Sequence, residues 1–285
     1  MISPANNIVS AAWLNQQLSD AVLAASIVVL DASAFMPDVP RDPQQEFIDV
    51  RIPTARFFDF NHKIAAPNTD LPHMLPSADL FTTEVAKLGV NNTSHVVIYD
   101  SQGMFSAPRG WWMFKAMGHD NVSVLDGGLP AWLAAGYATQ TGEPAAIESG
   151  DFCAKFRPNW VIDADTLCQK LDDKQIQIID ARPSARFLAT VKEPRAGIRS
   201  GHMPNAKNLP FGNLLVNGHF LATEQLKQQF DGLSNNQQQL IFSCGSGVTA
   251  CILALAAQQA GRDNVTVYDG SWTEWGANEN YPVVK

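Results

Sequence analysis

Short apolar runs alternate with amphipathic stretches along most of the chain. Residues 27–30, 95–99 and 240–243 are rich in β-branched or aromatic side chains, which is typical of buried strands. Residues 82–90 and 222–230 start with polar residues and continue with helical spacing of their apolar positions. Alternating strands and helices predict an α/β fold, in which a mostly parallel sheet carries helices on both faces.

The same pattern occurs twice in the chain. Four blocks of the first half match four blocks of the second half in the same order, and they share strand-ending aspartates, a Pro–Ala turn and the sequence Tyr/Leu–Asp–Gly. The matched pairs are 27–35 with 176–187, 50–60 with 201–211, 95–112 with 239–255, and 121–137 with 264–281. The chain is therefore predicted to be a duplicated domain.

The domain boundaries follow from the repeat. We predict a first domain at residues 1–140 and a second at residues 159–285. Residues 141–158 contain Gly, Pro and Ser without a clear period, so we expect them to form a linker.

Composition and charge narrow the function classes. Hydrophobic residues make up 46% of the 285 positions and charged residues 17%, so the chain can bury a substantial core. The net charge of −8 argues against a nucleic-acid partner, because nucleic-acid-binding domains are usually basic. No apolar run approaches the roughly 18 residues of a membrane-spanning helix, and the N-terminus lacks the pattern of a signal peptide. We therefore expect no membrane contact.

The four cysteines are scattered through the chain. They form no Cys-x-x-Cys pair and no spacing with histidine that is typical of a metal site. A long chain with few scattered cysteines is expected to be cytoplasmic with reduced thiols, and no metal or organic cofactor is predicted.

Polar residues stand where the predicted strands end. In α/β sheets of this kind, the chemistry is found at the carboxyl ends of the strands. Asp180 and Asp269 are expected to orient loop backbone or an arginine there. The residues at these positions are Asp31, Asp100, Asp126, Asp180, Cys244 and Asp269.

Cys244 lies in the sequence "SCGSGVTA", between a strand run and a helical run. The first N–H groups of a helix have no partner within the helix, and this end of the helix dipole is positive. Small residues allow several N–H groups to converge on one anion, so a reactive thiolate or a persulfide is expected at Cys244. The alternative is that Cys244 is a small buried hydrophobic residue, the commonest role of a free cysteine.

Two other cysteine-dependent enzyme classes fit the loop less well. A cysteine phosphatase needs an arginine six residues after the cysteine, where this chain has Ala250, and no cationic residue lies in the loop. A thiol hydrolase would need a histidine general base paired with the cysteine, and no local motif indicates one.

The sequence resembles the two-domain rhodanese-type sulfurtransferases, and among them the 3-mercaptopyruvate sulfurtransferase branch. The resemblance covers nearly the whole chain and is carried by "CGSGVTA", "IIDARPSARF", "GHMPNAKNLPF", "PHMLP", "SAPRGWWMF" and "YDGSWTEWG". Relatives that prefer thiosulfate typically carry basic residues after the cysteine. Gly245 and Ser246 stand there in this chain, which favours the mercaptopyruvate branch.

The resemblance implies a mechanism. Cys244 takes sulfur from 3-mercaptopyruvate as a persulfide and releases pyruvate. A thiol acceptor, such as thioredoxin or a small thiol, or cyanide then removes the sulfane sulfur. The resemblance implies catalysis in the second domain alone, and the first repeat agrees, since it has Asp100 in the place of Cys244.

The resemblance also implies roles for residues around the cysteine. Arg186 and Arg195 correspond to the arginines that bind the donor, and guanidinium groups suit the carboxylate and carbonyl of a 2-keto acid. The loop residues Gly245, Gly247, Val248 and Thr249 are expected to contact the donor. We expect Thr249 chiefly to cap the following helix.

A proton relay is a further implication of the resemblance. Ser246 is a candidate relay or hydrogen-bond donor to the leaving enolate, although a simple turn role is equally compatible with its position. His73 matches a histidine proposed to work with this serine. The accompanying carboxylate is not evident, because the family's acidic position is Asn61 here, and Asp59 and Asp70 are the remaining candidates.

Two alternatives to a mercaptopyruvate sulfurtransferase stay open. One is a rhodanese that prefers thiosulfate. The other is a non-catalytic carrier module that accepts a persulfide from a partner protein, although such a carrier would have no need for two arginines suited to a keto acid.

Overall fold

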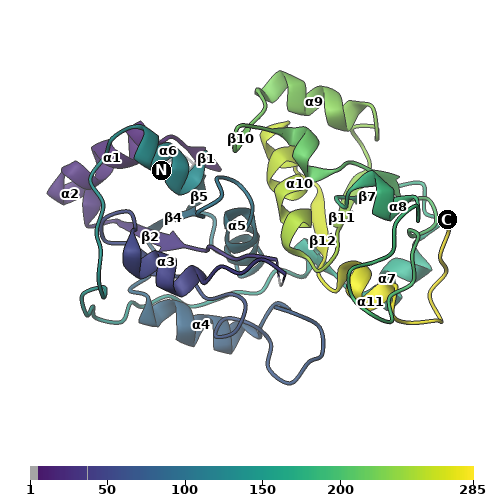
Figure 1. Ribbon diagram of the computed structural model, residues 1–285, viewed down its shortest axis with the longest axis horizontal. Helices are drawn as coiled ribbons and strands as arrows, with labels where there is room; N and C mark the ends of the chain where they lie inside the picture. The colour runs from purple at the N-terminus through teal and green to yellow at the C-terminus, as the bar shows by residue number, and fades with distance from the viewer. Residues whose placement is uncertain (1–5, 37) are drawn as a thin grey trace. The chain divides into compact units, whose positions relative to one another are not determined.

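The structure consists of two compact units, each built around its own parallel sheet (Figure 1). The computed structural model describes residues 6–36 and 38–285. The first unit comprises residues 1–67, 75–156 and 217–219, as far as they are described, and the second comprises residues 68–74, 157–216 and 220–285. Each half of the chain therefore contributes a short excursion to the other unit.

The sheet of the first unit has the strand order β1-β5-β4-β2-β3, and all neighbours are parallel. The long central strands pair in register, from Ile27 opposite His95 to Asp31 opposite Tyr99. The strands are β1 (Ile8–Val9), β2 (Ile27–Asp31), β3 (Arg56–Phe57), β4 (His95–Tyr99) and β5 (Val122–Leu125).

The sheet of the second unit repeats this order strand for strand, as β6-β12-β11-β7-β8, again with parallel neighbours. Its strands are β6 (Val161–Ile162), β7 (Ile176–Asp180), β8 (Lys207–Asn208), β11 (Gln239–Ser243) and β12 (Val265–Tyr268). A separate two-stranded ribbon is formed by β9 (Leu215–Val216) and β10 (His219–Phe220). The predicted duplication is thus confirmed at the level of topology.

Helices cover both faces of each sheet, because successive strand residues are mostly apolar and point to opposite sides. In the first unit the helices are α1 (Ala11–Ser19), α2 (Ala21–Ala24), α3 (Pro43–Asp49), α4 (Ala78–Lys87), α5 (Ala107–Ala116) and α6 (Gly128–Ala134). Val29 and Val97 pack with α1, α3 and α6 on one face, while Gly110 of α5 lies against Ile98 on the other.

The second unit follows the same plan. Its helices are α7 (Ala164–Gln169), α8 (Ser184–Phe187), α9 (Thr223–Asp231), α10 (Val248–Gln259) and α11 (Ser271–Trp275), with 3-10 turns at Pro158–Trp160 and Phe211–Leu214. Ile241 packs with α7 and α11 on one face. Phe242 meets Phe230 of α9 on the other, with ring centroids 6.1 Å apart. The predicted α/β class is confirmed.

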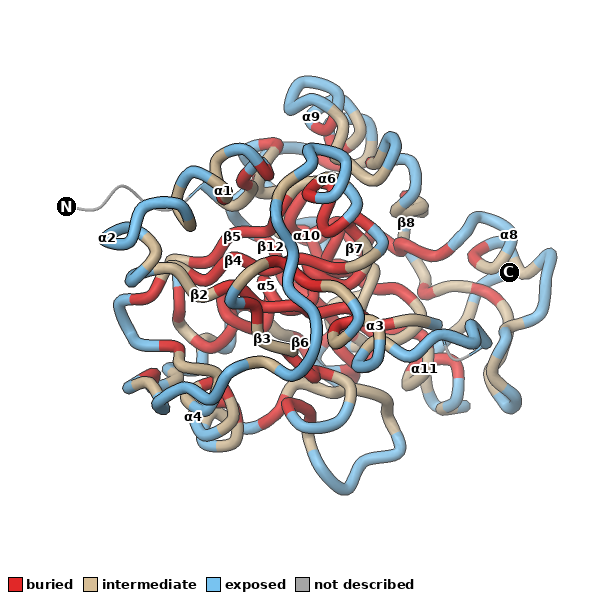
Figure 2. Tube along the Cα trace, turned by 60° about the vertical axis from the view of Figure 1, so that its left-hand side comes forward, coloured by how far each residue is buried: buried red, intermediate tan, exposed pale blue. Residues whose placement is uncertain are grey.

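The helix α10, which follows Cys244, is the most deeply buried helix of the second unit. Every side chain from Ala250 to Ala257 is buried, and the central strands beside it are buried as well (Figure 2). An apolar surface on all sides is expected of a helix enclosed by a sheet and a further helix. The position of the loop between β11 and α10, which carries Cys244, therefore depends on the packing of α10. No helix in the described part of the chain has both the length and the apolar character needed to cross a membrane.

Shortening Leu253 tests this packing. The side chain is fully buried in α10, so Leu253→Ala leaves a cavity and should lower the free energy of unfolding by about 2–5 kcal/mol. Urea unfolding followed by circular dichroism measures the change. Leu133→Ala, at a side chain that is 46% exposed, is the control and should shift the midpoint little. Equal effects of the two substitutions would contradict the assigned burial.

Candidate active site

The polar residues predicted to follow strands do so in both units. Asp31 and Asp180 are the last residues of β2 and β7, and Cys244 comes directly after β11. Asp100, Asp126 and Asp269 likewise follow β4, β5 and β12 directly. Because the strands are parallel, these residues gather at the carboxyl edge of their own sheet.

The loop after β11 holds the sulfur of Cys244 at the start of α10. The thiol is 2% exposed, and its Sγ accepts a hydrogen bond from the backbone N–H of Gly247 at 3.1 Å. Gly247 is the N-cap of α10 and has a φ of 83°, a conformation that glycine adopts without strain. The sulfur is therefore held by main chain at the positive end of a 12-residue helix, as the sequence predicted.

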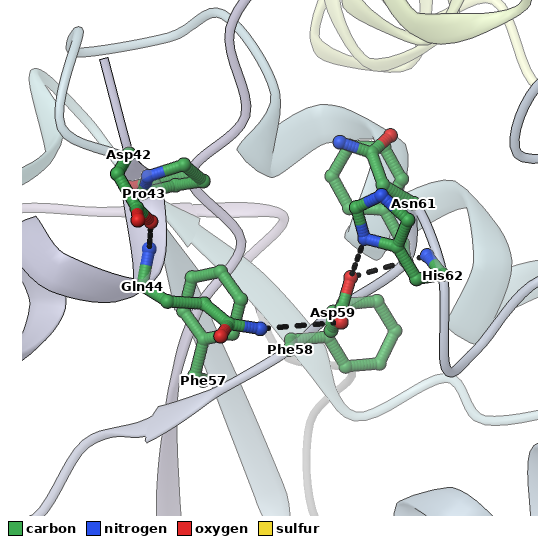
Figure 3. A pocket seen from close by; sticks show the side chains of 10 residues that line it. Asp42, Pro43, Gln44, Phe57, Phe58, Asp59, Asn61 and His62 are labelled. Carbon is green, nitrogen blue, oxygen red and sulfur yellow. Dashed lines mark hydrogen bonds and ion pairs between the residues drawn. The ribbon is translucent and has the colours of Figure 1, made fainter.

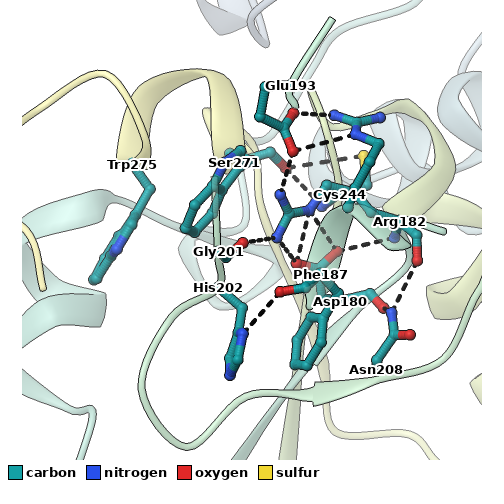
Figure 4. Close-up of polar contacts among 12 residues, drawn as sticks. Asp180, Arg182, Phe187, Glu193, Gly201, His202, Asn208, Cys244, Ser271 and Trp275 are labelled. Atoms are coloured by element: carbon teal, nitrogen blue, oxygen red, sulfur yellow. Dashed lines mark hydrogen bonds and ion pairs between the residues drawn. The ribbon is translucent and has the colours of Figure 1, made fainter. Parts of the chain in front are cut away.

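The segment after β12 supports the loop from the other side. Ser271 accepts the N–H of Cys244 with its Oγ at 3.1 Å, and this oxygen lies 4.0 Å from Sγ (Figure 4). The N–H groups of Trp272 and Thr273 donate to the carbonyl oxygens of Cys244 and Gly245 at 3.0 and 2.9 Å. Ser271 has a φ of 50°, which is uncommon for a residue other than glycine and indicates that the surrounding contacts impose this conformation.

The corresponding loop of the first unit holds a carboxylate side chain. Asp100 occupies the place of Cys244 and is fully buried. Its carboxylate accepts the N–H groups of Gln102, Phe105, Ser106 and Ala107 at 2.8–2.9 Å, at the start of α5. In this unit the strand–loop–helix junction therefore solvates an anion with backbone alone.

Arg186 and Arg195 both reach the loop that carries Cys244. They lie in the segment between β7 and β8, and a β-carbon on Gly245 would be 3.4 Å from Nη2 of Arg186 and 4.0 Å from Nη1 of Arg195. The structure thus brings the two predicted arginines together beside Cys244. A methyl group at Gly245 would be in ordinary van der Waals contact with both guanidinium groups, so the two arginines pack closely against the loop.

A buried ion-pair network orients Arg186. The side chain of Glu193 is 3% exposed. Its carboxylate accepts hydrogen bonds from Nη2 of Arg186 at 2.5 Å and from Nη1 of Arg182 at 2.9 Å. Arg182 in turn donates to Asp180 with Nη2 at 2.6 Å and stacks on Trp272, with Cζ 4.2 Å from the ring centroid (Figure 4). Two carboxylates and two guanidinium groups alternate in this network, so each buried charge has a partner. The prediction that Asp180 orients an arginine is confirmed.

His73 contacts the main chain of the loop. Its Nε2 lies 2.7 Å from the carbonyl oxygen of Ser246. A carbonyl oxygen can only accept a hydrogen bond, so Nε2 must carry a proton in this arrangement. His73 therefore holds the backbone of Ser246 and does not act as a base through this nitrogen.

The expected helix cap at Thr249 is wrong. The helix α10 begins at Val248 with Gly247 as its N-cap, so Thr249 lies within the first turn. Sequence periodicity placed the start two residues late, because the small residues before Ala250 carry no clear apolar pattern. The amides of Val248 and Thr249 are consequently among the first helical N–H groups, which have no partner within the helix.

Asp59 and Asp70 are the two carboxylates considered for the relay. Asp59 is buried in the first unit, beside a cavity of about 240 Å³, and its Oδ1 contacts Nδ1 of His62 at 3.0 Å (Figure 3). Gln44 reaches the other carboxylate oxygen at 3.5 Å. Asp70 is exposed. The observed partner of Asp59 is thus His62, at the position after Asn61.

Comparisons with known proteins agree with the fold. The family model of the rhodanese-like domain matches residues 10–135 and 163–278, so the chain belongs to the rhodanese family and carries two such domains. The chain is 43% identical over 305 residues to thiosulfate/3-mercaptopyruvate sulfurtransferase 2 of Arabidopsis thaliana, covering 99% of this chain and 88% of the relative. It is 39% identical to the 3-mercaptopyruvate sulfurtransferase of Escherichia coli K12, covering 96% of both chains.

A solved structure supports the same conclusion. The crystal structure of SseA from Escherichia coli, described as a 3-mercaptopyruvate sulfotransferase with the rhodanese fold, superimposes with a TM-score of 0.84 at 36% sequence identity. The match covers 94% of this chain and 99% of that chain. The resemblance predicted from the motifs is confirmed.

Sequence reasoning missed four residues that position the site: Arg182, Glu193, Ser271 and Thr273. Arg182 could have been found from the repeat, because the first unit has Ser33 in its place. Ser271 and Thr273 act through contacts with residues 27 and 28 positions away in sequence. Glu193 contacts Arg186 and Arg182 within its own segment, but no periodic pattern marks any of the three.

The difference between Ser33 and Arg182 in the two units also explains the unusual carboxyl group of Asp31. Asp31 corresponds to Asp180, but its neighbour is Ser33, which donates through N–H and Oγ and brings no positive charge. Burial, with a smaller effect of the nearby Asp100, raises the pKa of Asp31 to about 6 against the hydrogen bonds of Ser33. The folded protein therefore keeps a proton on Asp31 at pH values where the unfolded chain has lost it.

Asp31→Asn tests this effect. The unfolded carboxyl ionises near its model value of 3.8 and the folded one near 6, so stability should fall as pH rises from 4 to about 6. The cost at neutral pH should reach about 3 kcal/mol. Urea unfolding at pH 4 to 8 should show a flatter pH dependence for the variant than for the wild type. The exposed Asp263→Asn is the control, and identical pH profiles for wild type and Asp31→Asn would contradict the assignment.

Proposed function

We propose that the protein moves sulfane sulfur from 3-mercaptopyruvate to a thiol or to cyanide through a persulfide on Cys244. One observation supports this most strongly. The thiol lies at the start of α10, where a backbone N–H reaches it, and two guanidinium groups lie beside the next residue, Gly245. The names of the relatives from Arabidopsis thaliana and Escherichia coli point in the same direction.

The donor matches the charges of the site. 3-Mercaptopyruvate carries a carboxylate, an adjacent carbonyl and a thiol, and Arg186 and Arg195 offer guanidinium N–H groups for the first two. With the donor so held, its sulfur points towards Cys244.

The transfer proceeds in two displacements. The Cys244 thiolate attacks the donor sulfur, the carbon–sulfur bond breaks, and the electron pair remains on carbon as the enolate of pyruvate. A proton converts the enolate to pyruvate. The acceptor thiolate then attacks the outer sulfur of the persulfide, and Cys244 leaves as a thiolate, ready for the next donor.

The remaining loop residues solvate the changing charges. In our proposal the N–H groups of Gly245, Gly247, Val248 and Thr249 surround the sulfur anion and its persulfide. The Ser246 hydroxyl donates a hydrogen bond to the leaving enolate. His73 holds Ser246 in place through its carbonyl oxygen.

The acceptor and the cellular location belong to the same proposal. All four cysteines are free, which fits a reducing compartment such as the cytoplasm. A protein thiol such as that of thioredoxin, or a small thiol, would then be the acceptor.

A preference for thiosulfate is the second candidate, because the name of the Arabidopsis relative includes both donors. Thiosulfate has no carboxylate and carries two negative charges, and the loop supplies no lysine or arginine of its own. We therefore expect kcat/KM to be higher for 3-mercaptopyruvate. The ratio of the two values decides between the candidates.

Replacing the nucleophile tests the proposal first. Cys244→Ser should lower pyruvate release from 3-mercaptopyruvate by at least about a thousandfold, because the alcohol cannot carry the sulfane sulfur. The unfolding midpoint should change little. Cys153→Ser, at an exposed thiol, is the control and should keep full activity. Normal turnover of Cys244→Ser would rule out this nucleophile.

Removing a guanidinium tests the donor site. Arg186→Gln should lower kcat/KM for 3-mercaptopyruvate about 10- to 100-fold, since a charge-assisted hydrogen bond is worth about 1.5–3 kcal/mol. Lys192→Gln removes an exposed charge from the same segment and serves as the control. If steady-state pyruvate assays gave the same loss for both variants, a specific donor contact of Arg186 would be excluded.

A further inference from the structure

Thr273, in α11, forms a hydrogen-bonded bridge between the loop that carries Cys244 and the side chain of Arg195. Its Oγ1 donates to the carbonyl oxygen of Gly245 at 2.7 Å and accepts Nη1 of Arg195 at 3.1 Å. Its backbone N–H donates to the same carbonyl oxygen at 2.9 Å. A hydroxyl group can donate and accept at once, and this bridge uses both capacities.

The two arginines differ in how they are held. Arg186 is paired with the buried carboxylate of Glu193, which neutralises its charge locally. Among residues 6–36 and 38–285, the Thr273 hydroxyl is the only hydrogen-bond partner of the Arg195 guanidinium. A neutral partner fixes the position of Arg195 and leaves its positive charge uncompensated.

This difference separates the roles of the arginines in donor binding. An anion gains more from a guanidinium without a carboxylate partner than from one that is already paired. The donor carboxylate is therefore expected at Arg195, and the uncharged carbonyl oxygen of the donor at Arg186. A carboxylate in the place of Thr273 would hold Arg195 as firmly but would compete with the donor.

We propose that Thr273 is a positioning residue that sets the affinity for the donor carboxylate by fixing Arg195 and Gly245 in one hydrogen-bonded unit. This inference rests on the proposed sulfur transfer. It goes beyond that proposal by assigning the carboxylate to Arg195 and by naming the residue that aligns it with the loop.

The test compares three substitutions of similar size. Thr273→Val keeps the shape but loses both side-chain hydrogen bonds, Thr273→Ala is a second variant without the hydroxyl, and Thr273→Ser retains the hydroxyl. We expect Val and Ala to raise KM for 3-mercaptopyruvate about tenfold, with kcat within about threefold of the wild type. Ser should restore KM to within about twofold. Thr83→Val, at an exposed threonine of α4 whose Oγ1 donates to a main-chain carbonyl, is the control and should match the wild type.

A double-substitution cycle shows whether Thr273 acts through Arg195. In the Arg195→Gln background, Thr273→Val should add little to the increase in KM, because the partner of the hydroxyl is already lost. Additive effects would overturn the proposal. So would a loss of kcat with KM unchanged, the same KM for Thr273→Ser as for Thr273→Val, or failure of both hydroxyl-free variants to fold. If the wild type released no pyruvate from 3-mercaptopyruvate, the proposed function itself would fail, which is a separate outcome.

Discussion

The site depends on one constraint, which is that the first N–H groups of a helix need an acceptor. The duplicated units meet it in two ways at the same topological place. In the first unit the Asp100 carboxylate accepts four backbone N–H groups. In the second unit, the sulfur of Cys244 accepts the N–H of Gly247. The side chain of Asp100 satisfies the first junction from within the chain, whereas a sulfur at the second leaves an atom there that can form and break a bond.

Buried charge distinguishes the units as clearly as the cysteine does. In the second unit Asp180 is followed by Arg182, whose guanidinium links it to Glu193 and thereby to Arg186. In the first unit Ser33 stands in the place of this arginine, and burial raises the pKa of Asp31 to about 6. The serine of the first unit therefore cannot form the ion pairs through which Arg182 links Asp180 to Glu193, the carboxylate that holds Arg186. The charged network and Cys244 occur in the same unit.

Much of this arrangement could be predicted from the sequence, since the information is local. Strand ends at Asp180 and Cys244 are marked by apolar runs, and the strand–Cys–Gly–helix junction indicates an anion site. The contacts of Thr273 could not be predicted, because they join segments that meet only when the second sheet has formed. Those of Glu193 lie within the segment between β7 and β8, which is largely irregular, so no helical or strand period indicates which side chains meet. The start of α10 was misplaced because Gly245, Ser246 and Gly247 have no hydrophobic periodicity. Comparing the two repeats would have indicated a role for Arg182, because Ser33 stands in its place in the first unit.

The position of the transferred sulfur tests the account most directly. A crystal structure of the protein after reaction with 3-mercaptopyruvate, without an acceptor, would show it. The account predicts one additional sulfur atom bonded to Sγ of Cys244 and within hydrogen-bond distance of backbone N–H groups between Gly245 and Thr249. An additional sulfur on Cys251 or another cysteine, or a persulfide at Cys244 with these N–H groups turned away from it, would contradict the account.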